Sequence, residues 1–194
     1  MKKLFYILTI IVVLGFIGVL GFTKSNMSLT YEIGDKVDSL NGVYVYYNGN
    51  VGNVEGRSLT EDGYNLGLKY QCVEFVKRYY FEALNHKMPD SYGHAKDFFN
   101  VQLEDGLLNE QRNLKQFTNP SLKKPAINDL VVYSGTLVNQ YGHVAIISNV
   151  FEHEIEIIQQ NPGTFGSSRK RIGLFYKDGK WKIDHSQIIG WLRK

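Results

Sequence analysis

Cys72, in the stretch YQCVEF, is the only cysteine in the chain. It lies in the first turn of a helix that the spacing of Val73, Val76 and Tyr80 predicts over residues 71–86. The unpaired N–H groups and the dipole at a helix N-terminus favour an anion, so a thiolate there would have a lowered pKa and act as a nucleophile. The alternative is packing in the core, where free cysteines commonly lie. Cys72 is therefore either a nucleophile or a small core residue.

A nucleophilic cysteine needs a nearby base, and the chain offers histidines at 86, 94, 143, 153 and 185. His86 lies about four helical turns from Cys72, roughly 20 Å away by helix rise. His94 and His153 have polar neighbours that are typical of the surface. His143 opens a predicted strand in the stretch YGHVAII, at a strand end that can face a cleft. His143 is therefore the candidate base, and a hydrogen-bonded histidine at a sheet edge is the structural alternative.

Amide side chains are the candidates to orient His143 and to bind an oxyanion. If strands at 143–150 and 154–160 pair around a turn near residue 152, His143 faces roughly Asn161, with Gln159 on the same face. An amide oxygen can accept from imidazole, although it stabilises imidazolium less than a carboxylate does. The side-chain N–H of Gln71, with the backbone N–H of Cys72, could bind the oxyanion of a tetrahedral intermediate. Ordinary polar residues at a strand end and a helix start are the structural alternatives, and a one-residue slip of register would change the faces.

The elements that hold these residues are one main helix and a following series of strands. A strand is predicted at 42–49, then a long loop at 51–70; a weaker helix at 91–103 precedes a loop at 117–129. Three apolar strands, a hairpin and a closing strand follow, at residues 129–134, 143–150, 154–160, 172–184 and 186–193. Asp178-Gly179 provides the two-residue turn of the hairpin. A helix followed by an antiparallel meander indicates an α+β domain rather than a βαβ series.

The N-terminal segment differs in composition from the rest. Residues 4–22 carry no charge and follow two lysines, a pattern typical of a membrane-spanning helix with a cytoplasmic N-terminus. We expect residues 1–24 to be either an uncleaved anchor or a cleaved signal peptide, and residues 25–194 to be one extracytoplasmic domain, membrane-anchored or secreted. Residues 25–194 carry equal numbers of basic and acidic residues, which argues against nucleic-acid binding. A lone thiol in an oxidising compartment is a liability unless it is buried or used.

The pieces YQCVEFVKRYY, DLVVY, YGHVAIIS, IEIIQQNPG and IIGWLR, in this order, resemble the CHAP family of cysteine, histidine-dependent amidohydrolases and peptidases. The resemblance covers about residues 33–194 and is greatest to the amidase domain of glutathionylspermidine synthetase/amidase enzymes. It implies a papain-like CHAP fold, with N-terminal helices packed on a central antiparallel sheet of about five to six strands. It also implies Cys72 as nucleophile, His143 as general base and acid, and Gln71 as an oxyanion-hole residue. Gln159 stands where the family commonly has glutamate, which weakens the expected catalysis, and Asn161 is a second candidate to orient His143.

The resemblance implies an exported cysteine-dependent amidase or endopeptidase that forms an acyl-enzyme. Export favours cell-wall peptidoglycan peptides as the substrate. Overall similarity instead favours a small glutathione–polyamine amide, as in a glutathionylspermidine-type amidase. The departure at Gln159 leaves open a non-catalytic cell-wall binding module on the same fold. No metal or cofactor is expected, because the histidines are scattered and there is no second cysteine; the membrane is an expected partner through residues 4–22 if that segment is retained.

Overall fold

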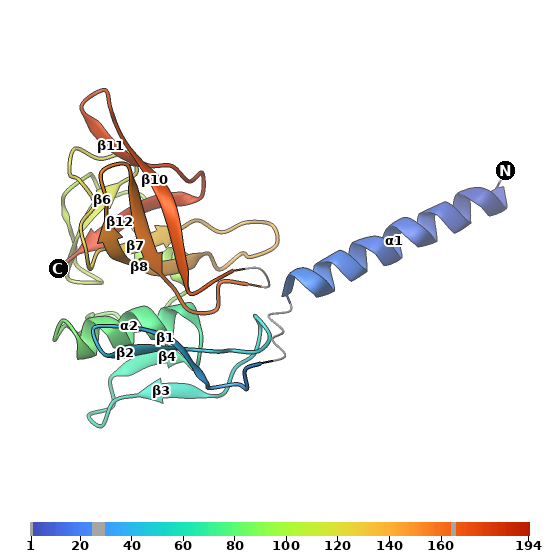
Figure 1. Cartoon of the computed structure of the whole chain (residues 1–194), viewed down its shortest axis with the longest axis horizontal. Coiled ribbons are helices and arrows are strands. Elements are labelled where there is room, and N and C mark those ends of the chain that lie inside the picture. Colours follow the sequence, from blue (N-terminus) through green and yellow to red (C-terminus); the bar gives the residue numbers. More distant parts are fainter. Residues whose placement is uncertain (1, 25–29, 164–165) are drawn as a thin grey trace.

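The computed structural model describes residues 2–24, 30–163 and 166–194 (Figure 1). Its first element, α1 (Lys2–Lys24), contains the uncharged segment 4–22 and lies apart from the other helices and strands. Side chains described on α1, such as Ile10 and Val12, are exposed. Within the part of the chain that the structure describes, no helix has the length and apolarity required to cross a membrane. The two clusters of buried apolar side chains are formed by residues that follow α1.

Eight antiparallel strands form the main sheet, in the order β11-β10-β9-β8-β7-β12-β6-β5. These strands are β5 (Leu108–Asn109), β6 (Leu114–Thr118), β7 (Leu130–Tyr133), β8 (His143–Val150), β9 (Glu154–Ile158), β10 (Arg169–Lys177), β11 (Lys180–Ile183) and β12 (Ile188–Arg193). The strands and the hairpin predicted after residue 129 are present, and together with the helix layer they confirm the α+β class. The expected number of five to six strands is too low, because the short strands β5, at the edge of the sheet, and β6, next to it, show too little apolar alternation to be recognised.

Smaller elements flank the sheet. β1 (Lys36–Leu40) pairs with β2 (Val43–Tyr46), and β3 (Arg57–Leu59) pairs with β4 (Asn65–Leu68) inside the predicted loop 51–70. The predicted helix 71–86 is observed as α2 (Cys72–Glu82), which ends earlier; nearby Asn85 takes a left-handed φ of 47°. A short 3₁₀ turn, η1 (Ala95–Phe98), forms where the sequence predicts a weak helix over 91–103.

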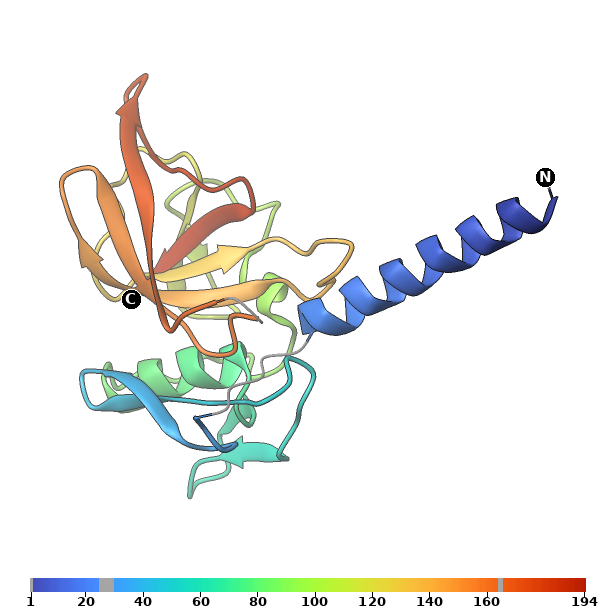
Figure 2. The same ribbon diagram turned by 45° about the vertical axis from the view of Figure 1, so that its right-hand side comes forward.

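Helix α2 packs against one face of the sheet and so fixes the position of Cys72. Its buried face includes Phe75, Val76 and Tyr80, which share a core cluster with Val144 and Ile146 of β8. A second cluster, around Trp191, fills the opposite face of the sheet. Figure 2 shows α2 lying along the sheet beside β8. Burial of each large apolar side chain contributes about 1.5–3 kcal/mol, so the start of α2 is held firmly against the start of β8.

The register between β8 and β9 decides which residues face His143. Ile146 pairs with Ile158 and Ile147 pairs with Ile157, which is the register that the sequence predicts at this end of the two strands. A register shift after Ile147 displaces only the far end of the pair, near the β8–β9 turn. The chain after Ile158 therefore runs beside the start of β8, where His143 lies. It lies on the side of β8 that is opposite to β7.

Candidate active site

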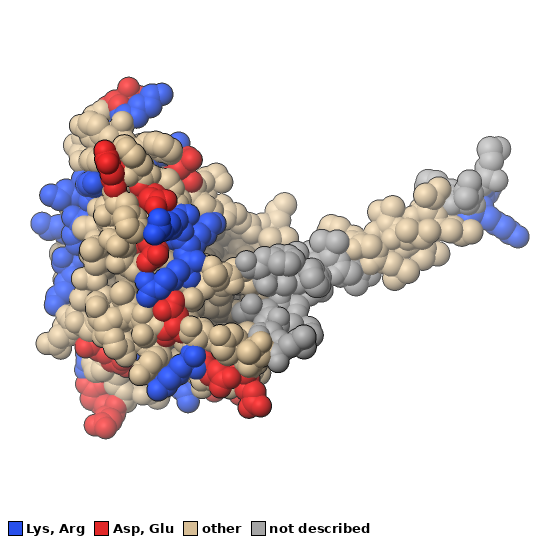
Figure 3. Space-filling view, viewed as in Figure 1, with Lys and Arg blue, Asp and Glu red and all other residues tan. Residues whose placement is uncertain are grey.

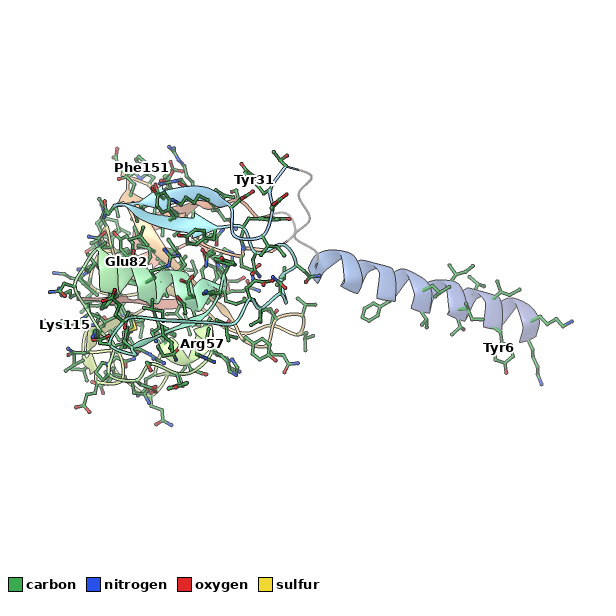
Figure 4. The ribbon with its side chains drawn as sticks, turned by 90° about the horizontal axis from the view of Figure 1, so that it is seen from below. Tyr6, Tyr31, Arg57, Glu82, Lys115 and Phe151 are labelled. Atoms are coloured by element: carbon green, nitrogen blue, oxygen red, sulfur yellow. The ribbon has the colours of Figure 1, made fainter. Side chains whose placement is uncertain are left out.

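Cys72 is the first residue of α2, and its backbone neighbour Gln71 occupies the N-cap position. In Figure 4, Glu82 marks the far end of α2, and the helix runs from there toward the side of the molecule where Tyr31 lies. Cys72 as a whole is half-buried, whereas its sulfur is surrounded by protein, and this burial raises the pKa of the thiol to about 11. The backbone N–H groups of Val144, Val73 and Cys72 itself lie near the sulfur and act on its pKa in the opposite direction. The lowered pKa expected from the helix N-terminus is therefore wrong for the free protein, because burial outweighs the local N–H groups.

His143 is the first residue of β8, and its neighbour Val144 supplies the N–H group that meets the Cys72 sulfur. The residue before it, Gly142, has a φ of +75°, and a Cβ there would lie 2.5 Å from the carbonyl oxygen of Tyr133. Only glycine fits this close approach and this backbone conformation. The chain therefore enters β8 at a fixed angle, which sets the direction of the imidazole.

The tautomer of His143 follows from its hydrogen bond to Gln159. The Nε2 atom lies 3.0 Å from Gln159 Oε1, and Gln159 Nε2 donates to the carbonyl oxygen of Ser167 at 2.9 Å. Because the Ser167 carbonyl can only accept, it fixes the amide with its oxygen toward the ring, so Nε2 of His143 carries the proton. The lone pair of a neutral His143 is then on Nδ1, as a general base requires.

Burial also acts on His143, lowering the pKa of the imidazole to about 4, while the hydrogen bond to Gln159 raises it slightly. With a thiol pKa of about 11, the resting pair consists of a neutral thiol and a neutral imidazole. A neutral amide at residue 159 does not offset the burial of an imidazolium as a carboxylate would. This arrangement suits proton transfer during nucleophilic attack rather than a preformed thiolate–imidazolium pair.

The amide network beside Cys72 joins Gln71 to Asn161. Gln71 Nε2 donates to the carbonyl oxygens of Val51 at 3.1 Å and Asn53 at 2.8 Å. Gln71 Oε1 accepts from Asn161 Nδ2 at 2.8 Å, and Asn161 Nδ2 also donates to Val51 O. Asn161, a predicted partner of His143, thus hydrogen-bonds Gln71 instead. Both amide hydrogens of Gln71 are engaged by loop carbonyls, so binding an oxyanion would require Gln71 to release one of them.

Comparison with known proteins agrees with this geometry. The sequence model of the CHAP domain matches residues 62–161, which is just over half of the chain and includes residues 71, 72, 143, 159 and 161. The protein belongs to the CHAP domain family. This confirms the family that the sequence motifs indicate.

Several curated proteins are similar to this protein over about two thirds of the chain. Trypanothione synthetase of Crithidia fasciculata is 29% identical over 71% of this chain and 22% of its own. The bifunctional glutathionylspermidine synthetase/amidase of Escherichia coli is 29% identical over 70% of this chain and 23% of its own. Glutathionylspermidine synthase of Crithidia fasciculata is 32% identical over 66% of this chain and 19% of its own. The chain therefore spans only about a fifth of the length of the curated relatives that it matches.

Gln160 is a residue of the CHAP site to which the sequence patterns assigned no role. It is fully buried; its Oε1 accepts from the backbone N–H of Tyr46, and its Nε2 donates to Gln71 O and Glu74 Oε2. Period-2 alternation places Gln160 opposite to Gln159, on the face that α2 covers, and this is the signal that could have identified it. Gln160 ties the strand end to β2 and to the first turn of α2.

The other histidines of the CHAP domain have structural or surface environments. His86 is buried, with Nε2 2.9 Å from Arg112 O. His153 is largely exposed, and His94 stacks on Tyr141 with ring centroids 4.6 Å apart. His185 Nδ1 accepts from a nearby backbone N–H. Among the described residues, no three His, Cys, Asp or Glu side chains gather as a metal site would require.

A cavity of about 270 Å³ opens beside Gln159 and Asn161. Its aromatic and polar lining includes Tyr31, Tyr46 and Ser167, and none of the described lining residues is acidic. A larger concavity of about 680 Å³ lies on the β5–β6–β12 edge and is lined by basic residues that include Lys115 and Lys194. Figure 3 shows basic side chains gathered on the side where the C-terminus lies in Figure 1. The cavity beside Gln159 is thus connected with the candidate site through Gln159, which hydrogen-bonds His143, although neither Cys72 nor His143 is among its described lining residues.

Proposed function

We propose that this CHAP domain is an exported thiol amidohydrolase that cleaves an amide bond in peptidoglycan peptides. The observation that carries the proposal is the hydrogen bond from His143 Nε2 to Gln159 Oε1, with the Cys72 sulfur at the backbone of the next residue, Val144. Cys72, His143 and Gln159 then correspond to the nucleophile, base and orienting group of a cysteine-hydrolase triad. The family and the amidase among its relatives support the same class of reaction.

In the proposed mechanism the Cys72 sulfur attacks the carbonyl carbon of the amide while His143 Nδ1 takes the thiol proton. The resulting imidazolium gives that proton to the amine nitrogen as the C–N bond breaks, leaving a thioester on Cys72. His143 then removes a proton from water as the water oxygen attacks the thioester carbon. The C–S bond breaks, the acid is released, and the imidazolium returns the proton to the Cys72 sulfur. Gln159 holds the imidazole tautomer through both steps.

The oxyanion of each tetrahedral intermediate is bound by the backbone N–H of Cys72 and the side chain of Gln71. Gln71 takes this role by releasing the carbonyl oxygen of Val51, which is the longer of its two contacts, at 3.1 Å against 2.8 Å to Asn53. Asn161 keeps Gln71 Oε1 in place during this exchange. A preorganised donor is commonly worth about 10²–10³ in rate, and the contribution of Gln71 is smaller than this by the cost of releasing Val51 O.

Two observations bear on the substrate. A glutathione–polyamine amide is the second candidate, because one relative is a bifunctional glutathionylspermidine synthetase/amidase. A polyamine is a cation that would need carboxylate partners, and the described lining of the cavity beside Gln159 supplies none. Peptidoglycan peptide is favoured by this lining and by the expected export of residues 25–194.

The test compares both substrates with the full chain, its Cys72→Ser and His143→Ala variants, and His153→Ala as a control at an exposed histidine. We expect new amino groups and shortened muropeptides by mass spectrometry, lost only in the Cys72 and His143 variants. Cleavage of glutathionylspermidine with intact peptidoglycan would transfer the proposal to the second candidate. Binding to peptidoglycan without cleavage of either substrate would identify a non-catalytic wall-binding module.

A further inference from the structure

The β7–β8 loop, residues 134–142, leads directly into His143 and carries an apolar tip. Leu137 is fully exposed at this tip, Val138 is 63% exposed and Tyr141 is 60% exposed. Figure 2 shows the loop extending beyond the sheet. Single apolar residues are common on protein surfaces, but two adjacent aliphatic residues with an exposed tyrosine beside a candidate active site require an explanation.

Hydrogen bonds hold this loop in shape. Thr136 N donates to Asn139 O at 2.7 Å, and Asn139 N donates to Thr136 Oγ1 at 3.0 Å. Asn139 Nδ2 donates to Gly142 O at 2.9 Å, at the entry to β8. The turn from Thr136 to Asn139 encloses Leu137 and Val138 and directs them outward. The exposure of the aliphatic pair is therefore built into the loop.

Aromatic and basic side chains surround the base of the tip. Tyr92 is 65% exposed, and Tyr141 stacks on the ring of His94. Exposed Lys96 donates its backbone N–H to Tyr141 O, and the guanidinium of Arg57 lies over the Tyr92 ring. Two carboxylates belong to this group: Asp97 accepts from the His94 backbone N–H, and Asp90 accepts from the Tyr92 backbone N–H. The aliphatic residues at the tip match the hydrocarbon of a membrane, and the tyrosines and cations behind them match the headgroup region.

We propose that the β7–β8 loop inserts Leu137 and Val138 into the interface of a bilayer that contains anionic lipids. A convex tip cannot enclose a bound peptide or sugar. The fluid apolar interior of a bilayer can surround a fully exposed leucine side chain. His143 follows Leu137 by six residues, at most roughly 20 Å of extended chain. Insertion of the tip therefore turns the Cys72–His143 site toward the headgroups and directs it to amides held at the membrane surface.

The test places an environment-sensitive nitrobenzoxadiazole label on the full chain in a Cys72→Ser background. One protein carries Leu137→Cys. The matched control carries Leu122→Cys, at a leucine that is also largely exposed, 71% against 101%, and lies in the connection that precedes β7, at the other end of that strand. Both proteins retain α1, so any attachment through α1 is common to both. Circular dichroism melts check that each labelled protein is folded.

We expect phosphatidylglycerol vesicles to shift the emission of the label at residue 137 to the blue, and phosphatidylcholine vesicles to shift it less. The label at residue 122 should not shift, and Val138→Glu should abolish the shift at 137 because a carboxylate in hydrocarbon is unfavourable. No shift at 137, or equal shifts at both residues, would overturn the proposal. A shift at 137 with peptidoglycan fragments but not with vesicles would also overturn it and assign the loop to a wall ligand.

Discussion

Replacing Gln159 with glutamate would place a carboxylate against the Nε2–H of His143, where the amide oxygen now lies at 3.0 Å. The gap between a thiol pKa of about 11 and an imidazole pKa of about 4 disfavours the ion pair by on the order of 10 kcal/mol. If the two charges were in contact, their attraction at an effective dielectric of about 20 would offset about 4 kcal/mol of this. The ion pair should therefore form in only about one molecule in 10⁴.

Under the same conditions the new carboxylate would stabilise the imidazolium by about 4 kcal/mol, which raises the pKa of His143 by about three. The population of the ion pair, and with it the thiolate available at neutral pH, should rise about a thousandfold. The glutamate also loses the N–H that donates to Ser167 O, so about 1–3 kcal/mol of folding free energy is lost with it.

The assay is the rate of iodoacetamide alkylation of Cys72 between pH 5 and 11. In the wild type, alkylation should be slow at neutral pH and rise toward the thiol pKa of about 11. In Gln159→Glu it should be fast from near pH 7, and a further His143→Ala change should abolish the gain. Gln111→Glu, at an exposed glutamine, controls for the added charge. A folded Gln159→Glu protein with the wild-type profile would refute the coupling of residue 159 to the thiol through His143.

Three further predictions concern stability. The pKa of His143 is about 4 in the fold and about 6.5 in the unfolded chain, so the unfolded chain binds the extra proton between these values. The free energy of unfolding should therefore fall by about 3 kcal/mol as the pH falls from 6.5 to 4, and urea titrations should show a flatter profile in His143→Phe. The ammonium of Lys77 is buried against backbone carbonyls such as Ser91 O, and its pKa is lowered from 10.5 to about 7. Stability should therefore rise with pH between 7 and 10.5, and Lys77→Met should remove that rise; an unchanged slope in the same titrations would contradict it. Gln160→Leu removes the acceptor of the Tyr46 backbone N–H and one donor each to Gln71 O and Glu74 Oε2, which keep other donors. It should lower the free energy of unfolding by about 1–3 kcal/mol, whereas Gln140→Leu at an exposed position should not.

The sequence predicted the positions of the candidate site residues in the fold better than their electrostatics. Cys72 and His143 stand at ends of elements that follow clear periodic patterns, and the strand register brings Gln159 to His143. The direction of the Cys72 pKa could not be predicted, because it depends on how deeply the packed chain surrounds the sulfur. The contacts of Gln71 could not be predicted either, since they come from a loop about 20 residues earlier in the chain.

The fold, too, could be predicted from the sequence only in part. The hairpin turn at Asp178-Gly179 was predictable, and both residues have the positive φ of a two-residue turn, 52° and 76°. The ladder between β3 and β4 was not, because these strands are short and the glycines around them also suit a loop. The end of α2 depended on the left-handed conformation of Asn85, which the helical spacing alone does not reveal.

Three consecutive residues after β9 have three different partners. Gln159 binds His143, Gln160 binds β2 and α2, and Asn161 binds Gln71. One inserted or deleted residue here would exchange all three partners at once, so this segment should reject any change in length. The exposed β10–β11 turn at residues 178–179 contacts none of these groups and should accept inserted peptides, affinity tags or new chain termini. For an engineer who recombines domains of this family, the length of the segment 159–161 should be kept and the β10–β11 turn is the part that can be changed.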